Sequence, residues 1–161
     1  LIIMSAIYPD GTVAAFEAEA TSAGVSLRLD PPAPGSVRAS VDADRCAQMV
    51  ANLVGNALGF ASTTVWVRVQ REGPDAVIEV LDDGPGIPTS ELGKVFDRLY
   101  QADNQRDRRR TGSGLGLAIV AELAQRMDAR VGVSSDEGHG ARFWIRLPAP
   151  GHVQTTTRPR G

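Results

Sequence analysis

Residues 108–120 read RRRTGSGLGLAIV, with three arginines, then three glycines spaced two apart, then an aliphatic run. The pattern indicates a basic loop that enters a helix whose first turn is rich in glycine. Free N–H groups and the positive end of a helix dipole favour an anion such as phosphate at that position. Taken alone, a solvated charged loop and glycines used for close packing explain the stretch equally well.

Three better-known phosphate-binding patterns do not fit this stretch. A dinucleotide-binding fingerprint follows a strand, whereas the preceding residues 101–111 (QADNQRDRRRT) have no strand pattern. A P-loop requires Gly-Lys-Ser/Thr after its glycines, and this chain contains no such tripeptide. The strand, catalytic-loop and Asp-Phe-Gly signatures of protein kinases are missing as well. If the stretch binds phosphate, it does so in another fold.

The segment NLVGNALGF, residues 52–60, places Asn52 and Asn56 four residues apart on an expected helix. Residues at this spacing project from the same side of a helix. Two amide oxygens one turn apart can serve as ligands of Mg²⁺, which prefers hard oxygen donors and shares its shell with water and phosphate. Hydrogen bonds to nearby backbone groups, or exposure to solvent, would explain the pair without a metal.

The segment DDGPGIP, residues 82–88, follows an apolar strand pattern. Its glycines allow the backbone to come close to a flat ligand, and Asp82 is placed to accept a hydrogen bond from an exocyclic amine. A simple turn at the end of a strand explains the same residues equally well, because Asp, Gly and Pro are common in turns.

Composition indicates an ordinary globular domain. The 161 residues are 42% hydrophobic and 22% charged, and the net charge of −2 does not favour nucleic acid as a partner. The single cysteine, Cys46, excludes an internal disulfide and is expected in the core. No apolar run is long enough for a membrane segment in this chain, and residues 1–11 do not resemble a signal peptide.

The hydrophobic periodicity predicts helices and strands in alternation, with hairpins at two places. Helices are expected at 11–23, 42–61 (capped by Asp42), 89–95 and 114–128, and strands at 25–30, 37–41, 63–70, 75–83, 130–135 and 141–147. This order predicts a two-layer α/β sandwich, in which a mixed, mostly antiparallel sheet carries helices on one face.

In order and spacing, these segments resemble the ATP-binding catalytic domain of sensor histidine kinases, within the superfamily that includes gyrase, Hsp90 and MutL. Residues 52–60 resemble its N box, 82–88 its first glycine box, 95–100 (VFDRLY) its F box and 112–120 its second glycine box. The resemblance implies the Bergerat ATP-binding fold. It divides the chain into a lead-in at 1–22, a catalytic domain at 23–148 with a lid at about 97–113, and a polar tail at 149–161 that is expected to be disordered.

The resemblance also implies a set of site residues. Asn56 would bind Mg²⁺, with Asn52 near the metal and the phosphates, and Asp82 would read the adenine amine, with Phe60 packed near the base. The implied catalytic residues are Asn52, Asn56 and Arg98. The implied ATP-binding residues are Asn52, Asn56, Phe60, Asp82, Gly84, Gly86, Ile87, Arg110, Gly112, Ser113, Gly114, Leu115, Gly116 and Leu117.

Asn52 bears on the kind of reaction. ATP-hydrolysing members of the superfamily carry a glutamate at the matching position, and an asparagine cannot act as a general base. The resemblance therefore implies transfer of the γ-phosphate, in trans, to a histidine of a dimerisation or phosphoacceptor domain, which in turn serves a response regulator. His139 and His152 both lack the sequence context of a phosphoacceptor. The implied location is the cytoplasm, either as a separate protein or as the cytosolic part of a membrane sensor kinase.

Three other functions stay open at this point. Gly59 stands where histidine kinases usually carry a basic residue, which would suit a nucleotide-binding module without transfer activity. An ATPase of the gyrase or Hsp90 type is the second alternative, although Asn52 counts against it. Binding of nucleic acid through residues 106–110 is the third, and the acidic overall balance disfavours it.

Overall fold

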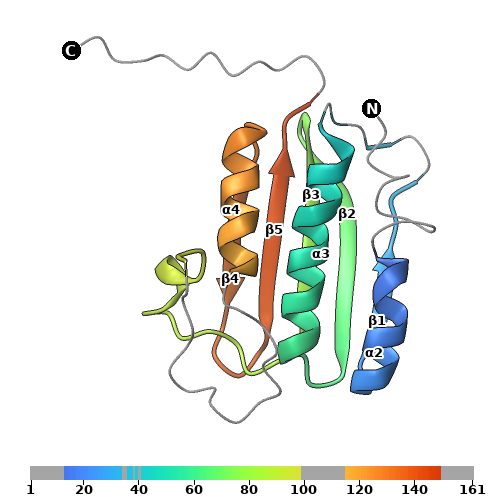
Figure 1. The fold of residues 1–161 in the computed structure, drawn as a ribbon, viewed down its shortest axis with the longest axis vertical. Helices are drawn as coiled ribbons and strands as arrows, with labels where there is room; N and C mark the ends of the chain where they lie inside the picture. The colour runs from blue at the N-terminus through green and yellow to red at the C-terminus, as the bar shows by residue number, and fades with distance from the viewer. Residues whose placement is uncertain (1–12, 34–35, 38, 40, 99–114, 150–161) are drawn as a thin grey trace.

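The structure is a computed structural model that describes residues 13–33, 36, 37, 39, 41–98 and 115–149. Within them, five strands form one sheet in the order β1-β2-β3-β5-β4 (Figure 1). The strands are β1 (Ser26–Asp30), β2 (Thr64–Glu72), β3 (Asp75–Asp82), β4 (Arg130–Ser135) and β5 (Ala141–Leu147). β1 and β2 run parallel and the other neighbours antiparallel, so the sheet is mixed and mostly antiparallel, as predicted.

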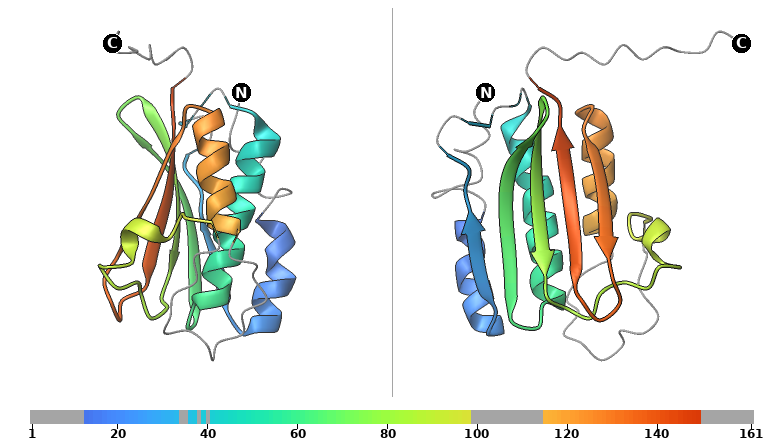
Figure 2. Two further views of the ribbon diagram at one scale, coloured as in Figure 1. Left: turned by 60° about the vertical axis from the view of Figure 1, so that its left-hand side comes forward. Right: turned by 180° about the vertical axis from the view of Figure 1, so that it is seen from behind.

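Three α-helices and two short 3₁₀ helices accompany the sheet in the described residues. They are η1 (Ala14–Phe16), α2 (Glu17–Ala23), α3 (Ala43–Phe60), η2 (Leu92–Lys94) and α4 (Gly116–Arg126). The α-helices all cover the same face of the sheet, which Figure 2 shows edge-on. The predicted two-layer α/β sandwich is therefore confirmed. Within the described ranges, no helix has the length and apolar character needed to cross a bilayer.

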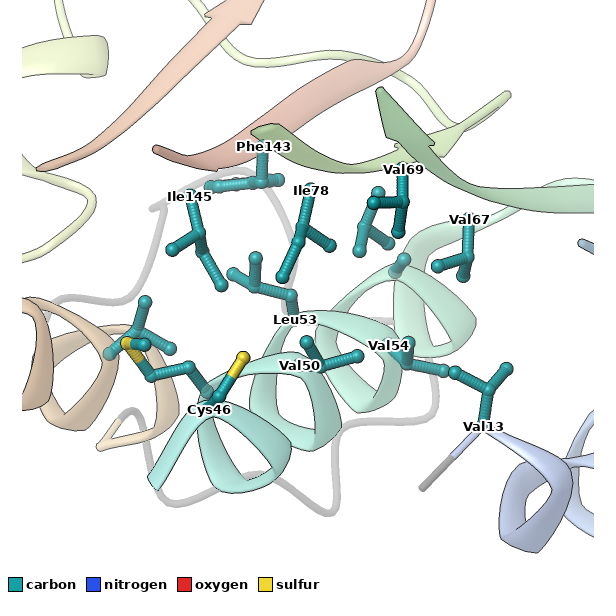
Figure 3. Packing of buried hydrophobic residues seen from close by; sticks show 14 of the residues in the cluster. Val13, Cys46, Val50, Leu53, Val54, Val67, Val69, Ile78, Phe143 and Ile145 are labelled. Atoms are coloured by element: carbon teal, nitrogen blue, oxygen red, sulfur yellow. The ribbon is translucent and has the colours of Figure 1, made fainter. Parts of the chain in front are cut away.

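The core lies between α3 and the inner face of the sheet. Alternate residues of β5 are buried, so that Phe143 and Ile145 point toward the helix while the residues between them face the other side. In Figure 3 these two side chains gather with Ile78 of β3 around Leu53 of α3. Burying a side chain of this size contributes about 1.5–3 kcal/mol to stability. Cys46 belongs to the same core, and burial raises the pKa of its thiol to about 12, which leaves it unreactive.

Among the described residues, no α-helix covers the opposite face of the sheet, which is built from aromatic and charged side chains. Trp144 of β5 packs over Gly132 of β4, where even a Cβ atom would overlap the indole ring. Glu79 of β3 is only 2% exposed, and its carboxylate accepts hydrogen bonds from Arg142 and lies 3.8 Å from Arg68. The ion pairs of this face tie β2, β3 and β5 together.

Two predicted elements differ from the structure. Residues 37, 39 and 41, which were expected in a strand, are not in one. Val37 and Ala39 are nonetheless buried in the core, so their apolar spacing reflects packing and not strand pairing. The helix predicted over 89–95 is reduced to the single 3₁₀ turn η2. Residues 1–12, 99–114 and 150–161, which include most of the predicted lid and the tail, lie outside the described residues.

Candidate functional site

Helix α3 positions the two asparagines. Asp42 caps it by accepting a hydrogen bond from the Arg45 backbone at 3.1 Å, and its apolar stripe faces the sheet, so both asparagines lie half-buried beside that stripe. The Asn52 Nδ2 atom donates to the Gln48 carbonyl at 2.9 Å. No hydrogen bond joins the Asn56 side chain to another of the described residues. The Asn56 amide is therefore available to a ligand.

The N box and the second glycine box meet at Asn52 and Gly116. Gly116 is the first residue of α4, and a Cβ atom on it would lie 3.1 Å from the Asn52 Oδ1 atom. A side chain at this position would press on the Asn52 amide, so the glycine allows α4 to begin beside α3. The structure therefore brings together two segments that lie far apart in the sequence.

Asp82 ends β3 on the buried face of the sheet and is 7% exposed. Burial raises its pKa to about 6, and the negative charge of Asp83 adds to this effect. Backbone hydrogen bonds from Gly84 and Ala141 act in the opposite direction. The Gly84 N–H donates to the Asp82 Oδ1 atom at 2.9 Å. Since a carboxylate accepts about four hydrogen bonds, Asp82 retains capacity for a ligand donor.

Gly84 brings the loop after β3 against the end of α3. A Cβ atom on Gly84 would lie 2.5 Å from the Phe60 carbonyl oxygen and 2.7 Å from the Asp82 Oδ1 atom. No side chain fits between these groups. Gly84 thus lies against both Phe60 and Asp82, which the sequence places in two separate motifs.

The first glycine box is docked on the turn between β4 and β5. The Ile87 N–H donates to the Ser135 hydroxyl at 2.8 Å, and the Gly138 N–H donates to the Pro85 carbonyl at 2.6 Å. Gly86 has a φ of +74°, and a Cβ atom there would overlap the Asp136 carbonyl. The glycines of this box are therefore required by contacts within the protein, in addition to any contact with a ligand.

Sequence reasoning missed two residues that support this arrangement. Ser135 accepts from Ile87 and donates to the Gly140 carbonyl. Gly140 has a φ of +81°, and a Cβ atom on it would overlap the Asp82 carbonyl. The only signal in the sequence is the pair of glycines in the predicted hairpin turn, and such a turn requires glycine for its own conformation.

The predicted residues around the lid are only partly described. Arg98 is exposed, and its Nη2 atom lies 3.2 Å from the Glu122 carboxylate of α4. Leu115 is 38% exposed, and Leu117 packs at the edge of the core. Arg110, Gly112, Ser113 and Gly114 lie outside the described residues.

The donor set suits Mg²⁺ bound jointly with phosphate, and not a metal held by protein alone. Among the described residues, no three His, Cys, Asp or Glu side chains gather as a metal site would require. Mg²⁺ commonly takes one or two protein oxygens and completes its shell with water and substrate phosphates. The uncommitted amide of Asn56 fits that role.

Residues 41–151 match the family model described as histidine kinase-, DNA gyrase B- and HSP90-like ATPase. The match covers more than half of the chain and includes both asparagines, Asp82 and the glycines named above. The chain belongs to this ATPase family. Its fold and the order of its motifs agree with the match.

The relatives of this chain in sequence are histidine kinases. The signal transduction histidine-protein kinase AfsQ2 of Streptomyces coelicolor is 42% identical over 120 residues, which are 74% of this chain and 22% of AfsQ2. The chain spans between 13% and 32% of the length of the curated relatives compared with it.

Solved structures agree in fold. Full-length ShkA, determined in complex with AMPPNP, superposes with a TM-score of 0.72 at 28% identity, over 85% of this chain and 28% of ShkA. The catalytic domain of the histidine kinase ThkA superposes with a TM-score of 0.71 at 21% identity, over 85% of this chain and 87% of that domain. The observed sheet and helices are thus those of histidine kinase catalytic domains.

Proposed function

We propose that this domain binds ATP with Mg²⁺ and transfers the γ-phosphoryl group in trans to a histidine on a separate dimerisation or phosphoacceptor domain or chain. The observation that carries the proposal is the position of Asp82. Its buried carboxylate has spare acceptor capacity and adjoins Phe60 at the end of the helix that bears both asparagines. This arrangement suits a base that presents an exocyclic amine to the carboxylate.

The side chains divide the work between the base and the phosphates. Asp82 accepts the hydrogen bond of the base amine and Phe60 packs near the ring, while Asn56 holds Mg²⁺ through its amide oxygen. The ion neutralises phosphate charge, which is the main requirement of phosphoryl transfer. Arg98 and the lid residues, with Arg110 among them, add positive charge on the phosphate side.

Asn52 favours transfer over hydrolysis. Its amide nitrogen donates to the Gln48 carbonyl, and its amide oxygen faces Gly116. An amide oxygen is far too weak a base to activate water at neutral pH. We therefore expect slow release of free phosphate and faster transfer to a protein acceptor.

The acceptor is expected in another domain. His139 lies in the exposed turn between β4 and β5, with its Nδ1 atom 3.2 Å from the Glu137 carbonyl, and His152 lies outside the described residues. Neither histidine is close in sequence to the proposed phosphate-binding residues. The sensor kinases among the relatives suggest that the acceptor in turn serves a response regulator, and that this domain works in the cytoplasm or as the cytosolic part of a sensor kinase.

The test is incubation of the 161-residue chain with ATP labelled at the γ-phosphate, with and without a histidine-bearing dimerisation domain. We expect an acid-labile label on the dimerisation domain only, and none on the chain alone. Strong labelling of the chain itself, or phosphate release that outpaces transfer, would contradict the proposal.

Asn56→Asp is the matched variant, because it nearly preserves size while it removes the amide donors and adds a negative charge beside the phosphates. Transfer should fall at least tenfold, which corresponds to about 1.4 kcal/mol of activation free energy. Circular dichroism and thermal melting should match the unsubstituted chain. Near-normal transfer by Asn56→Asp would show that the site assignment is wrong.

A further inference from the structure

Asp83, the second carboxylate of the first glycine box, binds the segment between α3 and β2. Its Oδ1 atom accepts hydrogen bonds from the backbone N–H groups of Ser62 and Thr63, each at 2.9 Å. Both carboxylate oxygens lie 3.1 Å from the Thr64 nitrogen, and the Thr63 hydroxyl donates to Oδ2. One side chain therefore collects donors from three consecutive residues that are about twenty positions away in the sequence.

Successive N–H groups that converge on one point form a binding site for an anion. Partial burial opposes ionisation of Asp83. The Thr63 hydroxyl and the backbone N–H groups of Thr63, Thr64 and Ser62 outweigh it and lower the pKa to about 2. Hydrogen bonds to a charged carboxylate are shorter and stronger than neutral ones. The Asp83 side chain is thus ionised and saturated by the protein at neutral pH.

The two adjacent carboxylates have opposite surroundings. Asp82 is buried, accepts only two backbone hydrogen bonds and keeps acceptor capacity. Asp83 is less buried, and its acceptor sites are occupied by residues 62–64. Asp82 can therefore accept a hydrogen bond from a ligand, whereas Asp83 links the end of β3 to residues 62–64.

The residues that Asp83 joins adjoin the site. α3 ends at Phe60, two positions before Ser62, and β3 ends at Asp82, directly before Asp83. We propose that Asp83 is a positioning residue that holds Phe60 and Asp82 in the relative placement that distinguishes adenine from guanine. This inference rests on the proposed function, since it assigns a base-recognition role to those two residues.

Aspartate is better suited to this role than its amide. Asparagine would keep one acceptor oxygen but would direct N–H groups toward the N–H donors of residues 62–64. Alanine would remove the carboxylate that accepts hydrogen bonds from all of these donors. We therefore expect a graded series, in which Asp83→Asn retains part of the effect and Asp83→Ala retains none.

The experiment compares the 161-residue chain with Asp83→Ala, Asp83→Asn and the control Asp44→Ala, which removes an exposed carboxylate from the start of α3. Calorimetry gives the Kd for Mg·ATP and for Mg·GTP, and hydrogen exchange by NMR without nucleotide reports on the amides of residues 62–64. Thermal melting shows whether each variant is folded.

We expect Asp83→Ala to weaken ATP binding at least tenfold and GTP binding much less, so that the preference for ATP is lost. Asp83→Asn should restore part of that preference, and Asp44→Ala should behave like the unsubstituted chain. Exchange at residues 62–64 should accelerate in the same order. A general loss of stability would weaken both nucleotides alike and would not change their ratio.

An unchanged ratio of ATP to GTP affinity in a folded Asp83→Ala variant would overturn the inference. If that variant does not fold, Asp83→Asn provides the test. The inference would also be overturned if Asp83→Asn had the same selectivity for ATP and the same exchange rates as the unsubstituted chain. Failure of the unsubstituted chain to bind ATP would instead contradict the proposed function, and the exchange measurement would still test whether Asp83 joins the two segments.

Discussion

The Arg98 guanidinium lies 3.2 Å from the Glu122 carboxylate, so an ion pair joins the start of the predicted lid to helix α4 beyond it. Arg126, one turn along α4, contacts the other oxygen of the same carboxylate at 2.6 Å. This ion pair engages Arg98, which the family resemblance assigns to the phosphates. Glu122 and the nucleotide would therefore compete for Arg98.

We predict that Glu122→Gln tightens ATP binding. Exposed ion pairs contribute up to about 1 kcal/mol, so releasing Arg98 from its carboxylate should lower the Kd by at most about fivefold. Calorimetry on Glu122→Gln, Arg98→Ala and the double variant measures this. The double variant should bind no more tightly than Arg98→Ala alone, and weaker binding by Glu122→Gln would show that the pair supports the site instead.

Asp82 should make the free energy of unfolding depend on pH. Burial raises its pKa to about 6, against 3.8 for an unburied carboxyl, so the folded chain binds the extra proton between these values. Stability should therefore fall as the pH rises from about 4 to about 6, by up to about 3 kcal/mol. Asp82→Asn should remove this dependence, raise the Tm at pH 7.5 and abolish ATP binding. Urea unfolding at several pH values tests it, and a less stable Asp82→Asn at pH 7.5 would contradict it.

Because Glu79 is buried, replacing Arg142 should cost more stability than replacing Glu79 itself. Arg142→Met leaves the Glu79 side chain, which is 3% exposed, with Arg68 as its remaining partner at 3.8 Å. This variant should lose about 3 kcal/mol of folding stability. Glu79→Met leaves Arg142 and Arg68 with side chains that are 38% and 44% exposed, so water can replace the lost partner and the cost should be about 1 kcal/mol. Guanidinium unfolding of both variants and of the double variant measures the asymmetry. Equal costs would argue against it.

Substitutions of Gly59 should raise helix stability and, with arginine, the affinity for ATP. It is exposed near the end of α3, and a Cβ atom on it would meet nothing within 4 Å. Gly59→Ala should stabilise the helix by about 1 kcal/mol without changing ATP affinity. Gly59→Arg should also tighten ATP binding, because it restores a positive charge three residues after Asn56, and added salt should reduce that gain. If Gly59→Arg and Gly59→Ala bind ATP equally, the charge does not reach the phosphates.

Much of the fold could be predicted because its signals are local. The buried spacing along α3, the alternation along β5 and the Asp42 cap each appear within a few residues, and the structure confirms all three. Residues 37–41 misled the prediction because apolar alternation reports burial and not the partner that a strand needs.

The candidate site was harder to predict because its contacts join distant segments. The sequence singles out Asn52, Phe60 and Asp82, but it gives no sign that Ser135 would anchor the glycine box or that Asp83 would bind residues 62–64. A serine or an aspartate near a turn has many local uses. Its partner across the fold becomes visible only when the strands are paired.

The aromatic face of the sheet has a practical consequence for anyone who studies this protein in solution. Both tryptophans, Trp66 and Trp144, project from strand positions that alternate with the buried residues facing α3, whereas Asp82 and Phe60 belong to the helix-covered side. Intrinsic fluorescence should therefore follow the unfolding of the sheet and stay silent during a titration with ATP. A fluorescence assay of binding needs a labelled nucleotide or a reporter placed beside α4.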